Sequence, residues 1–529
     1  MKSIKNIALL KTIALVLGVS LLNSCDIESE LLTNISNESF YQTQDDAYDA
    51  LVACYDGMQI ATGGVKESFY TASEVGSDDC FGGTGISDGY NYQVIDEFDI
   101  SRAPSYTDLY NNIWINYYRA IYRCNVLLQK MDQITWDDDN ARAQYEAEAK
   151  FIRAYSYFDM VRLWGNIPLV TEPTTDNIPQ SDPDEVYTVI AEDLLYAAEN
   201  LPDEVYSSTE SGRITRWAAK SMLARVYLYY TGYYSKSDLV GLVSQSDALD
   251  HLEDVIASSG HALVSDFGTL WEAADVENYA GENNEEIVFA VKYTYTSNYT
   301  GDTDGNLWKV MFGMRGLNQY PYGQGWGVTV NSKLYDLYDS GDSRRWATVI
   351  SVDDEDLPVD ITAQREYTGY YNKKYTPLLT EDGEYPGAAA GGDSDFQLNQ
   401  MQDYFVIRYA DVLLMASELG STNAQTYFDE VRHRALGNDY TQLTVTQDRI
   451  MEERHKEFAL EGIRYWDLLR QGVSTAANTI GETTTVYSGG VETTKTIDGA
   501  QITATQGLFQ IPNTQISLSG GVLQQNTGW

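Results

Sequence analysis

Apolar side chains recur at helical spacing over long stretches near both ends of the chain. The clearest case lies between residues 142 and 164, where Phe151, Ala154, Phe158 and Val161 follow one another three or four positions apart. This spacing places the side chains on one face of an α-helix. A glycine and a proline follow shortly afterwards and predict the end of that helix.

The same periodicity predicts a series of further helices. They are expected at residues 106–132, 184–200, 214–232, 246–258, 403–419 and 423–436, and from about 446 to 470 with an interruption near Gly462. Another begins after Thr43, which forms a capping box with Asp46. Helices that follow one another in pairs favour a tetratricopeptide-like superhelix, although no clean repeat of about 34 residues is found.

The middle of the chain has a different character. Residues from about 260 to 400 are rich in Gly, Asp, Thr and Tyr, with short strand-like pieces at Ile287–Val291 and Gly327–Val330. Residues 471–507 are rich in Thr and Gly, which predicts a strand pair or a surface excursion. Long loops in a compact protein are usually functional. We therefore expect a mainly α fold with an inserted irregular, loop-rich region that contains short strands.

The first residues have the layout of a secretory signal. Basic residues such as Lys2 and Lys5 precede an apolar run, Ile13 to Leu22, which is too short for a stable membrane span. The run leads into Leu-Asn-Ser-Cys25, which resembles a bacterial lipobox. That resemblance implies a signal peptide at residues 1–24 and acylation of Cys25, which would anchor the chain in outer-membrane lipid.

Acidic residues follow the cysteine at once. Asp26, Glu28 and Glu30 resemble the export tag of lipoproteins that Bacteroidetes place on the outer face of the outer membrane. We expect residues 25–36 to form a lipidated tether and the protein to face the exterior.

The net charge of the protein excludes one class of partner, namely nucleic acid. The formal net charge of −43 leaves no basic footprint for nucleic acid. Anionic polymers would be repelled by such a field, so a neutral ligand is expected. An apolar share of 43% supports a sizeable core.

Three cysteines remain besides Cys25, namely Cys54, Cys80 and Cys124. An odd number in an exported protein argues against a full disulfide framework. Cys54 and Cys124 fall on apolar helix faces, where a thiol packs as a small hydrophobe. No metal or redox role is assigned to them.

Five segments resemble the SusD/RagB family of outer-membrane nutrient-binding lipoproteins of Bacteroidetes. They are EAKFIRAYSYFDMVRLWGNIPL at 148–169, TRWAAKSMLARVYL at 215–228, RYADVLLMASE at 408–418, ERHKEFALEGIRYWDLLR at 453–470, and Ile511-Pro512 with Gln525-Asn526. Their order and their spread over nearly the whole chain make the match specific. Asp411 stands where the family more often has Glu.

The resemblance implies both a fold and a function. The fold is a SusD-like helical superhelix, with N-terminal helical residues 37–260, a loop-rich ligand-binding region at 261–400 and C-terminal helical residues 401–529. The implied function is capture of a glycan for a SusC-like TonB-dependent outer-membrane transporter, although some members handle peptides.

Charged residues within these motifs are expected to be structural. Charges interleaved with aromatics on helices make ion pairs and stacked contacts between helices. The residues concerned are Arg153, Arg162, Glu461, Arg464, Asp467 and Arg470.

A glycan site needs exposed aromatic faces for sugar C–H groups and polar side chains for hydroxyls. The irregular regions supply both, and Trp326 ranks first because its glycine neighbours cannot bury it locally. The predicted ligand-binding residues are Trp326, Trp308, Tyr320, Tyr322, Asp79, Phe81, Tyr90, Tyr92, Tyr370 and Tyr371.

No catalytic motif accompanies these residues. The four histidines show no metal-ligand spacing, and neither a nucleophile elbow nor a phosphate-binding loop occurs. We therefore predict no enzyme, no catalytic or metal-ligand residue and no cofactor, and a structural calcium stays open as an alternative. A peptide-binding lid of an oligopeptide importer and, more remotely, a surface glycoside hydrolase are the competing functions.

Overall fold

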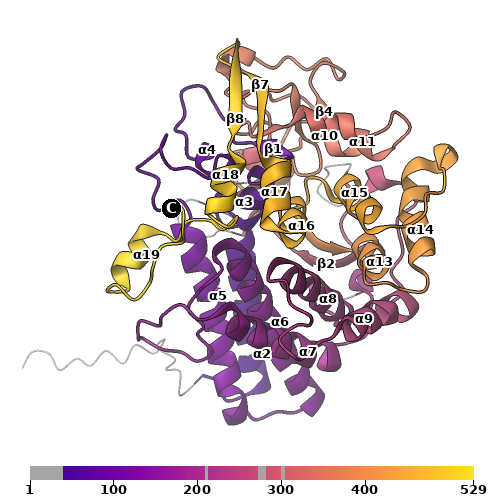
Figure 1. The fold of residues 1–529 in the computed structure, drawn as a ribbon. Coiled ribbons are helices and arrows are strands. Elements are labelled where there is room, and N and C mark those ends of the chain that lie inside the picture. Colours follow the sequence, from indigo (N-terminus) through magenta and orange to yellow (C-terminus); the bar gives the residue numbers. More distant parts are fainter. Residues whose placement is uncertain (1–39, 209–211, 272–280, 299–303, 399) are drawn as a thin grey trace, which may run out of the picture.

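The computed structural model describes residues 40–208, 212–271, 281–298, 304–398 and 400–529 (Figure 1). The predicted signal peptide, the lipidation site Cys25 and the predicted tether lie outside the described residues. Within the described part of the chain, no helix combines the length and the apolar character that a bilayer crossing requires.

Helices account for most of the regular structure. They are α2 Gln44–Gly63, α3 Phe69–Val75, α4 Gln93–Asp96, α5 Asn111–Lys130, α6 Asp139–Trp164, α7 Pro183–Asn200, α8 Arg216–Tyr233, α9 Gln245–Ser258, α10 Ser332–Leu337, α11 Arg344–Thr348, α12 Pro386–Ala389, α13 Tyr409–Glu418, α14 Ala424–Leu436, α15 Gln447–Phe458, α16 Arg464–Arg470, α17 Val473–Ile480, α18 Gly499–Ala504 and α19 Asn513–Leu518. The strands are β1 Cys80–Phe81, β2 Ile287–Val291, β3 Thr329–Val330, β4 Val349–Ser351, β5 Tyr370–Asn372, β6 Tyr404–Arg408, β7 Glu482–Ser488 and β8 Val491–Ile497.

The long helices stack in chain order into a tetratricopeptide-like superhelix. Helix α2 packs on α5, α5 on α6, α6 on α7, α7 on α8 and α8 on α9. Helix α9 then contacts α13, which packs on α14, so the C-terminal helices continue the N-terminal stack (Figure 1). The predicted capping box at Thr43 and Asp46 is present. The predicted stop after α6 is confirmed at Gly165, where φ is +68°.

One predicted helix begins later than expected. Residues 404–408 form β6, and helix α13 starts only at Tyr409. The strand pairs antiparallel with β2, which lies more than a hundred residues earlier in the chain. The segment is buried at every position. Its apolar run therefore suits a core strand as well as a helix, and only the distant partner decides between them.

The described strands form two-stranded sheets, of which β1–β3 and β2–β6 connect the loop-rich region to the rest of the molecule. The pairs are β1 with β3, β2 with β6, β4 with β5, and β7 with β8. The β7–β8 pair confirms the strand pair predicted within residues 471–507. Figure 1 shows this hairpin at the end of the molecule opposite α2 and α7, and Tyr487 of β7 forms a bridge with Tyr367.

The charged motif residues are structural, as predicted. Arg153 pairs with Asp193 at 2.8 Å, and Arg162 pairs with Asp159 at 2.5 Å. Both pairs are largely buried; the first joins α6 to α7, whereas the second lies within α6. Further members of the set, Arg464, Asp467, Arg470 and Glu461, make ion pairs of the same kind.

Candidate functional site

The pairing of β1 with β3 brings two glycine-rich segments side by side. After β1, the N–H of Thr84 donates to the carbonyl of Gly327 at 2.9 Å. Gly83 has a φ of +55°, and a Cβ there would overlap the same carbonyl oxygen, so the close approach requires glycine. We call residues 82–90 the first site loop and residues 313–328 the second site loop.

Two arginines hold the first site loop in place. The Arg365 guanidinium donates to three of its carbonyl oxygens, those of Ile86, Asp88 and Gly89, at 3.0, 2.6 and 2.7 Å. Arg315, from the second site loop, pairs with the Asp88 carboxylate at 2.8 Å. The planar fork of an arginine can serve several acceptors at once, so the loop is fixed by side chains from distant segments.

Tyr90 presents a fixed ring at the end of the first site loop. Its side chain is 39% exposed. The guanidinium carbons of Arg365 and Arg102 lie 4.1 and 4.5 Å from the ring centroid, which are cation–π distances. The ring borders a cavity of about 460 Å³ that the β7–β8 hairpin also lines, including Ser488 and Lys495.

Trp326 is partly exposed on the second site loop. Lys66 and Arg315 lie 5.0 and 5.1 Å from its ring, and the ring centroid of Phe396 lies 6.2 Å away. Lys66 in turn donates to the side-chain oxygen of Gln397 at 2.6 Å. The indole is therefore held by cations and a second ring while part of its surface stays accessible.

Tyr320, on the same loop, is the most exposed of the predicted tyrosines. Its side chain is 52% exposed. Nearby, Tyr385 donates to the Asn318 side chain at 3.1 Å and accepts a bond from the Gln324 N–H. Tyr90, Tyr320 and Trp326 thus lie on two loops that hydrogen bonds and ion pairs hold together, and we call these three rings the aromatic site.

Six predicted contact residues require correction because they are buried: Trp308, Tyr322, Asp79, Phe81, Tyr92 and Tyr371. Trp308 stacks on Tyr70 at a centroid distance of 3.8 Å, inside the main core. Tyr322 belongs to a smaller core with Tyr371. Glycine neighbours do not prevent burial, since segments from elsewhere in the chain cover these rings. They have no free face to offer a ligand.

Tyr370 is half-buried and lies in a different cluster. It stacks on Tyr335 of α10 at 4.6 Å, and Arg345 lies 3.7 Å from the Tyr335 ring. Its position in β5 ties it to β4. The structure thus groups Tyr370 with α10 and α11 instead of the aromatic site.

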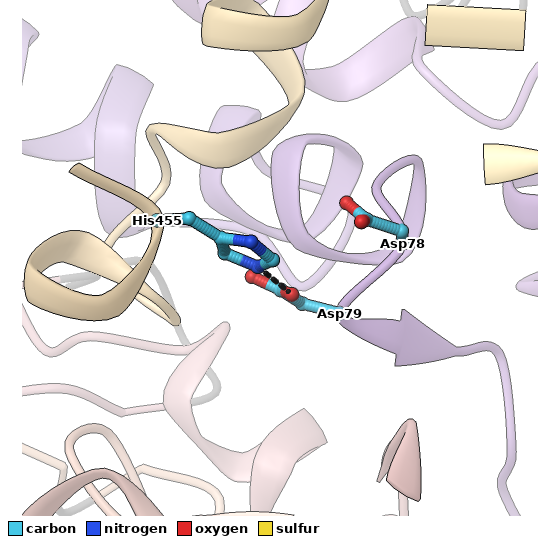
Figure 2. A group of neighbouring side chains, drawn as sticks. All are labelled: Asp78, Asp79 and His455. Atoms are coloured by element: carbon cyan, nitrogen blue, oxygen red, sulfur yellow. Dashed lines mark hydrogen bonds and ion pairs between the residues drawn. The ribbon is translucent and has the colours of Figure 1, made fainter. Parts of the chain in front are cut away.

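Asp78, Asp79 and His455 form a group close enough to hold a metal ion (Figure 2). Figure 2 shows the His455 ring directed at Asp79, with Nε2 2.7 Å from the carboxylate. Arg464 already donates to both oxygens of Asp78, at 2.8 and 2.9 Å. Burial by itself raises the pKa of Asp78, but the bonds from Arg464 outweigh it and lower the pKa. The group fixes the start of β1, and hence the first site loop, to α15 and α16.

Several residues at the aromatic site were missed by the sequence argument. Lys66, Arg102 and Phe396 stand in segments without a distinctive pattern, and the segment of the β7–β8 hairpin was predicted only as a strand pair or a surface excursion. All of them reach the site through contacts between distant segments. The role of Arg315 and Arg365 as holders of the first site loop likewise follows only from the structure.

Two family profiles match this chain. Residues 72–228 match the profile described as "Starch-binding associating with outer membrane", and residues 354–529 match that of the SusD family. A SusD-like protein of Formosa agariphila is 27% identical over 521 residues, covering 89% of this chain and 92% of the relative. The starch-binding protein SusD of Bacteroides thetaiotaomicron is 21% identical over 519 residues, covering 90% and 87%.

Solved structures match over nearly the whole length. A laminarin-binding SusD-like protein superposes with a TM-score of 0.73 at 29% identity, covering 92% of this chain and 100% of that one. Surface glycan-binding protein A from Bacteroides fluxus gives 0.77 at 24% identity with the same coverage. The second likeness concerns the fold alone. Together they confirm the predicted fold, a mainly α-helical SusD-like superhelix.

Proposed function

The chain belongs to the SusD/RagB family, and on that premise we propose that it is a non-catalytic surface lipoprotein that captures a glycan. It then passes the glycan to a SusC-like TonB-dependent transporter in the outer membrane, beside which the acylated Cys25 holds it. The observation that carries the proposal is the aromatic site, in which Tyr90 and Tyr320 are exposed and Trp326 is partly exposed. Arg365 and Arg315 hold the first site loop, which carries Tyr90, in place.

The aromatic site suits a ligand with flat apolar faces and a polar rim. Each ring contact contributes about 0.5–1.5 kcal/mol. Three such contacts, with a few hydrogen bonds of about 1 kcal/mol each, reach the roughly 4–8 kcal/mol of millimolar to micromolar binding. A polymer that touches many anchored copies gains avidity beyond this. Weak single-site binding is therefore compatible with efficient capture.

A neutral glycan fits the charges around the site. Arg315 is paired with Asp88 and Arg102 with Glu97, so neither cation calls for an anionic ligand. The net charge of −43 repels polyanions. The likeness to a laminarin-binding SusD-like protein makes laminarin oligosaccharides the first ligands to test.

Titration calorimetry of the purified protein with laminarihexaose, maltohexaose and a peptide mixture tests this proposal. We expect binding of an oligosaccharide, with an affinity that grows with its chain length. Trp326→Ala should weaken that binding about tenfold, which corresponds to about 1.4 kcal/mol. Trp346→Ala is the matched control, because Trp346 is 48% exposed but packs near Tyr335, away from the aromatic site.

Other outcomes favour the competing functions. A heat of binding with the peptide mixture, but with none of the glycans, would support a peptide-binding lid. Release of reducing sugar by the purified protein would support a hydrolase. Equal glycan affinity of Trp326→Ala and the unchanged protein would remove the aromatic site from the proposal.

A further inference from the structure

Helices α2 and α5 lie antiparallel and in close contact. At one end of the contact the Asn116 side chain donates to the carbonyl of Ile60 at 3.5 Å. One turn further, a Cβ on Gly57 would lie 3.0 Å from the Cα of Ala120, so the two backbones nearly touch there. Each turn back along α2 is therefore matched by one turn forward along α5.

The next matched turn brings two cysteines together. Arg123 donates to the carbonyl of Ala53 at 2.9 Å, which continues the same register by one more turn. Cys54 and Cys124 follow these two residues and face the core, each 0% exposed. Burial and, after it, the neighbouring Cys54 thiol raise the pKa of the Cys124 thiol, as expected for two thiols that lie beside each other across the helix contact. Both are free thiols in this structure.

We propose that Cys54 and Cys124 are joined by a disulfide in the exported protein. Two antiparallel helices in close contact bring facing Cα atoms into the range of about 4.4–6.8 Å that a disulfide spans. A protein bound for the outer membrane crosses the periplasm, where disulfides form and persist. Cys80, which belongs to β1 and is buried near Asp78 and Asp79, stays a thiol.

The reaction needs an external acceptor, for which we name a periplasmic thiol–disulfide oxidoreductase. The two thiols lose two protons and two electrons as the S–S bond forms. The disulfide of the oxidoreductase takes them up and becomes a dithiol. A mixed disulfide between the enzyme and one of the two cysteines is the intermediate.

Oxidation is expected before α2 docks on α5. The thiolate is the reactive form, and burial raises the pKa of the Cys124 thiol well above its usual value. The folded protein therefore reacts slowly in either direction, which protects a bond once it has formed. The loop that the bond closes, residues 54–124, contains β1 and the first site loop.

Counting thiols in protein from the outer-membrane fraction tests the proposal. Cells are quenched in acid, and the full-length lipoprotein is denatured and alkylated with and without prior reduction. We expect one alkylated residue, Cys80, without reduction and three after it. Digestion of the unreduced protein should yield one linked pair of peptides that carry Cys54 and Cys124.

Single substitutions sharpen the assignment. Cys80→Ser should leave the linked peptides intact, and Cys54→Ser should make Cys124 alkylatable without reduction. The double variant Cys54→Ala/Cys124→Ala should have the melting temperature of the reduced protein, below that of the oxidised one. Three alkylated cysteines in the unreduced outer-membrane protein, or a linked pair that includes Cys80, would overturn the proposal.

Discussion

Arg408 and Arg365 are both buried, but they stabilise different parts of the molecule in different ways. Arg408, 1% exposed, pairs with Glu461 at 2.8 Å and Glu457 at 2.9 Å, at or just after the end of α15, and with Glu286 beside β2. Arg365 has no carboxylate partner among the described residues. It donates to three carbonyls of the first site loop and lies against Tyr90.

The two arginines differ in the groups that would lose a hydrogen-bond or ion-pair partner if the arginine were removed. The carboxylates around Arg408 are buried. Without the arginine they would remain charged and out of contact with water, which would destabilise the whole fold. Carbonyls around Arg365 belong to one surface loop and can turn to solvent. The scaffold arginine therefore controls stability, whereas the loop arginine controls the shape of the aromatic site.

The largest expected effect is on the scaffold. Arg408→Met should lower the free energy of unfolding by about 3–5 kcal/mol, because it leaves Glu286, Glu457 and Glu461 with too little positive charge. Urea denaturation measures this change. Arg142→Met is the control, since its pair with Asp132 is exposed and contributes about 1 kcal/mol or less. If both variants lost the same free energy of unfolding, burial of the ion pairs around Arg408 would not explain their contribution to stability.

A second effect on the scaffold appears in acid. Burial by itself raises the pKa of Asp467, but Arg454 and Arg470 outweigh it and hold the pKa well below its usual value. A carboxylate with a depressed pKa stabilises the fold above its unfolded pKa of about 4, and that stability is lost as pH falls through the folded pKa. Asp467→Asn should therefore cost of the order of 2 kcal/mol at neutral pH.

The comparison with the unchanged protein isolates this carboxylate from all others. Unfolding free energies of the two proteins, measured by urea titration at a series of pH values, should converge as pH falls below about 4. A constant difference across that range would mean that the stability does not come from ionised Asp467.

The smallest effect is expected at the first site loop, where a substitution should weaken ligand binding. A lysine cannot reach three carbonyls as the fork of an arginine does, so Arg365→Lys should loosen the first site loop. We expect about tenfold weaker binding of the oligosaccharide, or about 1.4 kcal/mol, with a smaller change in urea midpoint than Arg408→Met gives. Arg449→Lys is the matched control, because Arg449 bonds a single carbonyl, that of Thr444, away from the site. A large loss of stability without loss of affinity would reverse the comparison.

The helical half of the fold followed closely from local pattern. Helix α6 was predicted from its apolar spacing and from Gly165, and α15 and α16 were predicted with their break near Gly462. In each case the signal lies within one or two turns of the residues it describes. Strand β6 was missed because its buried run has no period of its own, and its partner β2 is distant in the chain.

The aromatic site shows even more clearly the difference between what local spacing predicts and what contacts between distant segments decide. Tyr90, Tyr320 and Trp326 were predicted together with Trp308, Tyr322 and Phe81, and composition alone could not separate the two sets. Residues such as Tyr70 and Phe396, far away in the chain, decide which rings are covered. Sequence spacing carries no information about such contacts.

By itself, then, the amino-acid sequence determined the family, the helical scaffold and the absence of recognisable catalytic motifs, because each rests on local spacing or on extended motifs. Tertiary structure alone decided which aromatic rings are exposed, which arginines hold the first site loop, and that Cys54 faces Cys124. These properties depend on which distant segments meet, and side-chain burial is a result of that meeting.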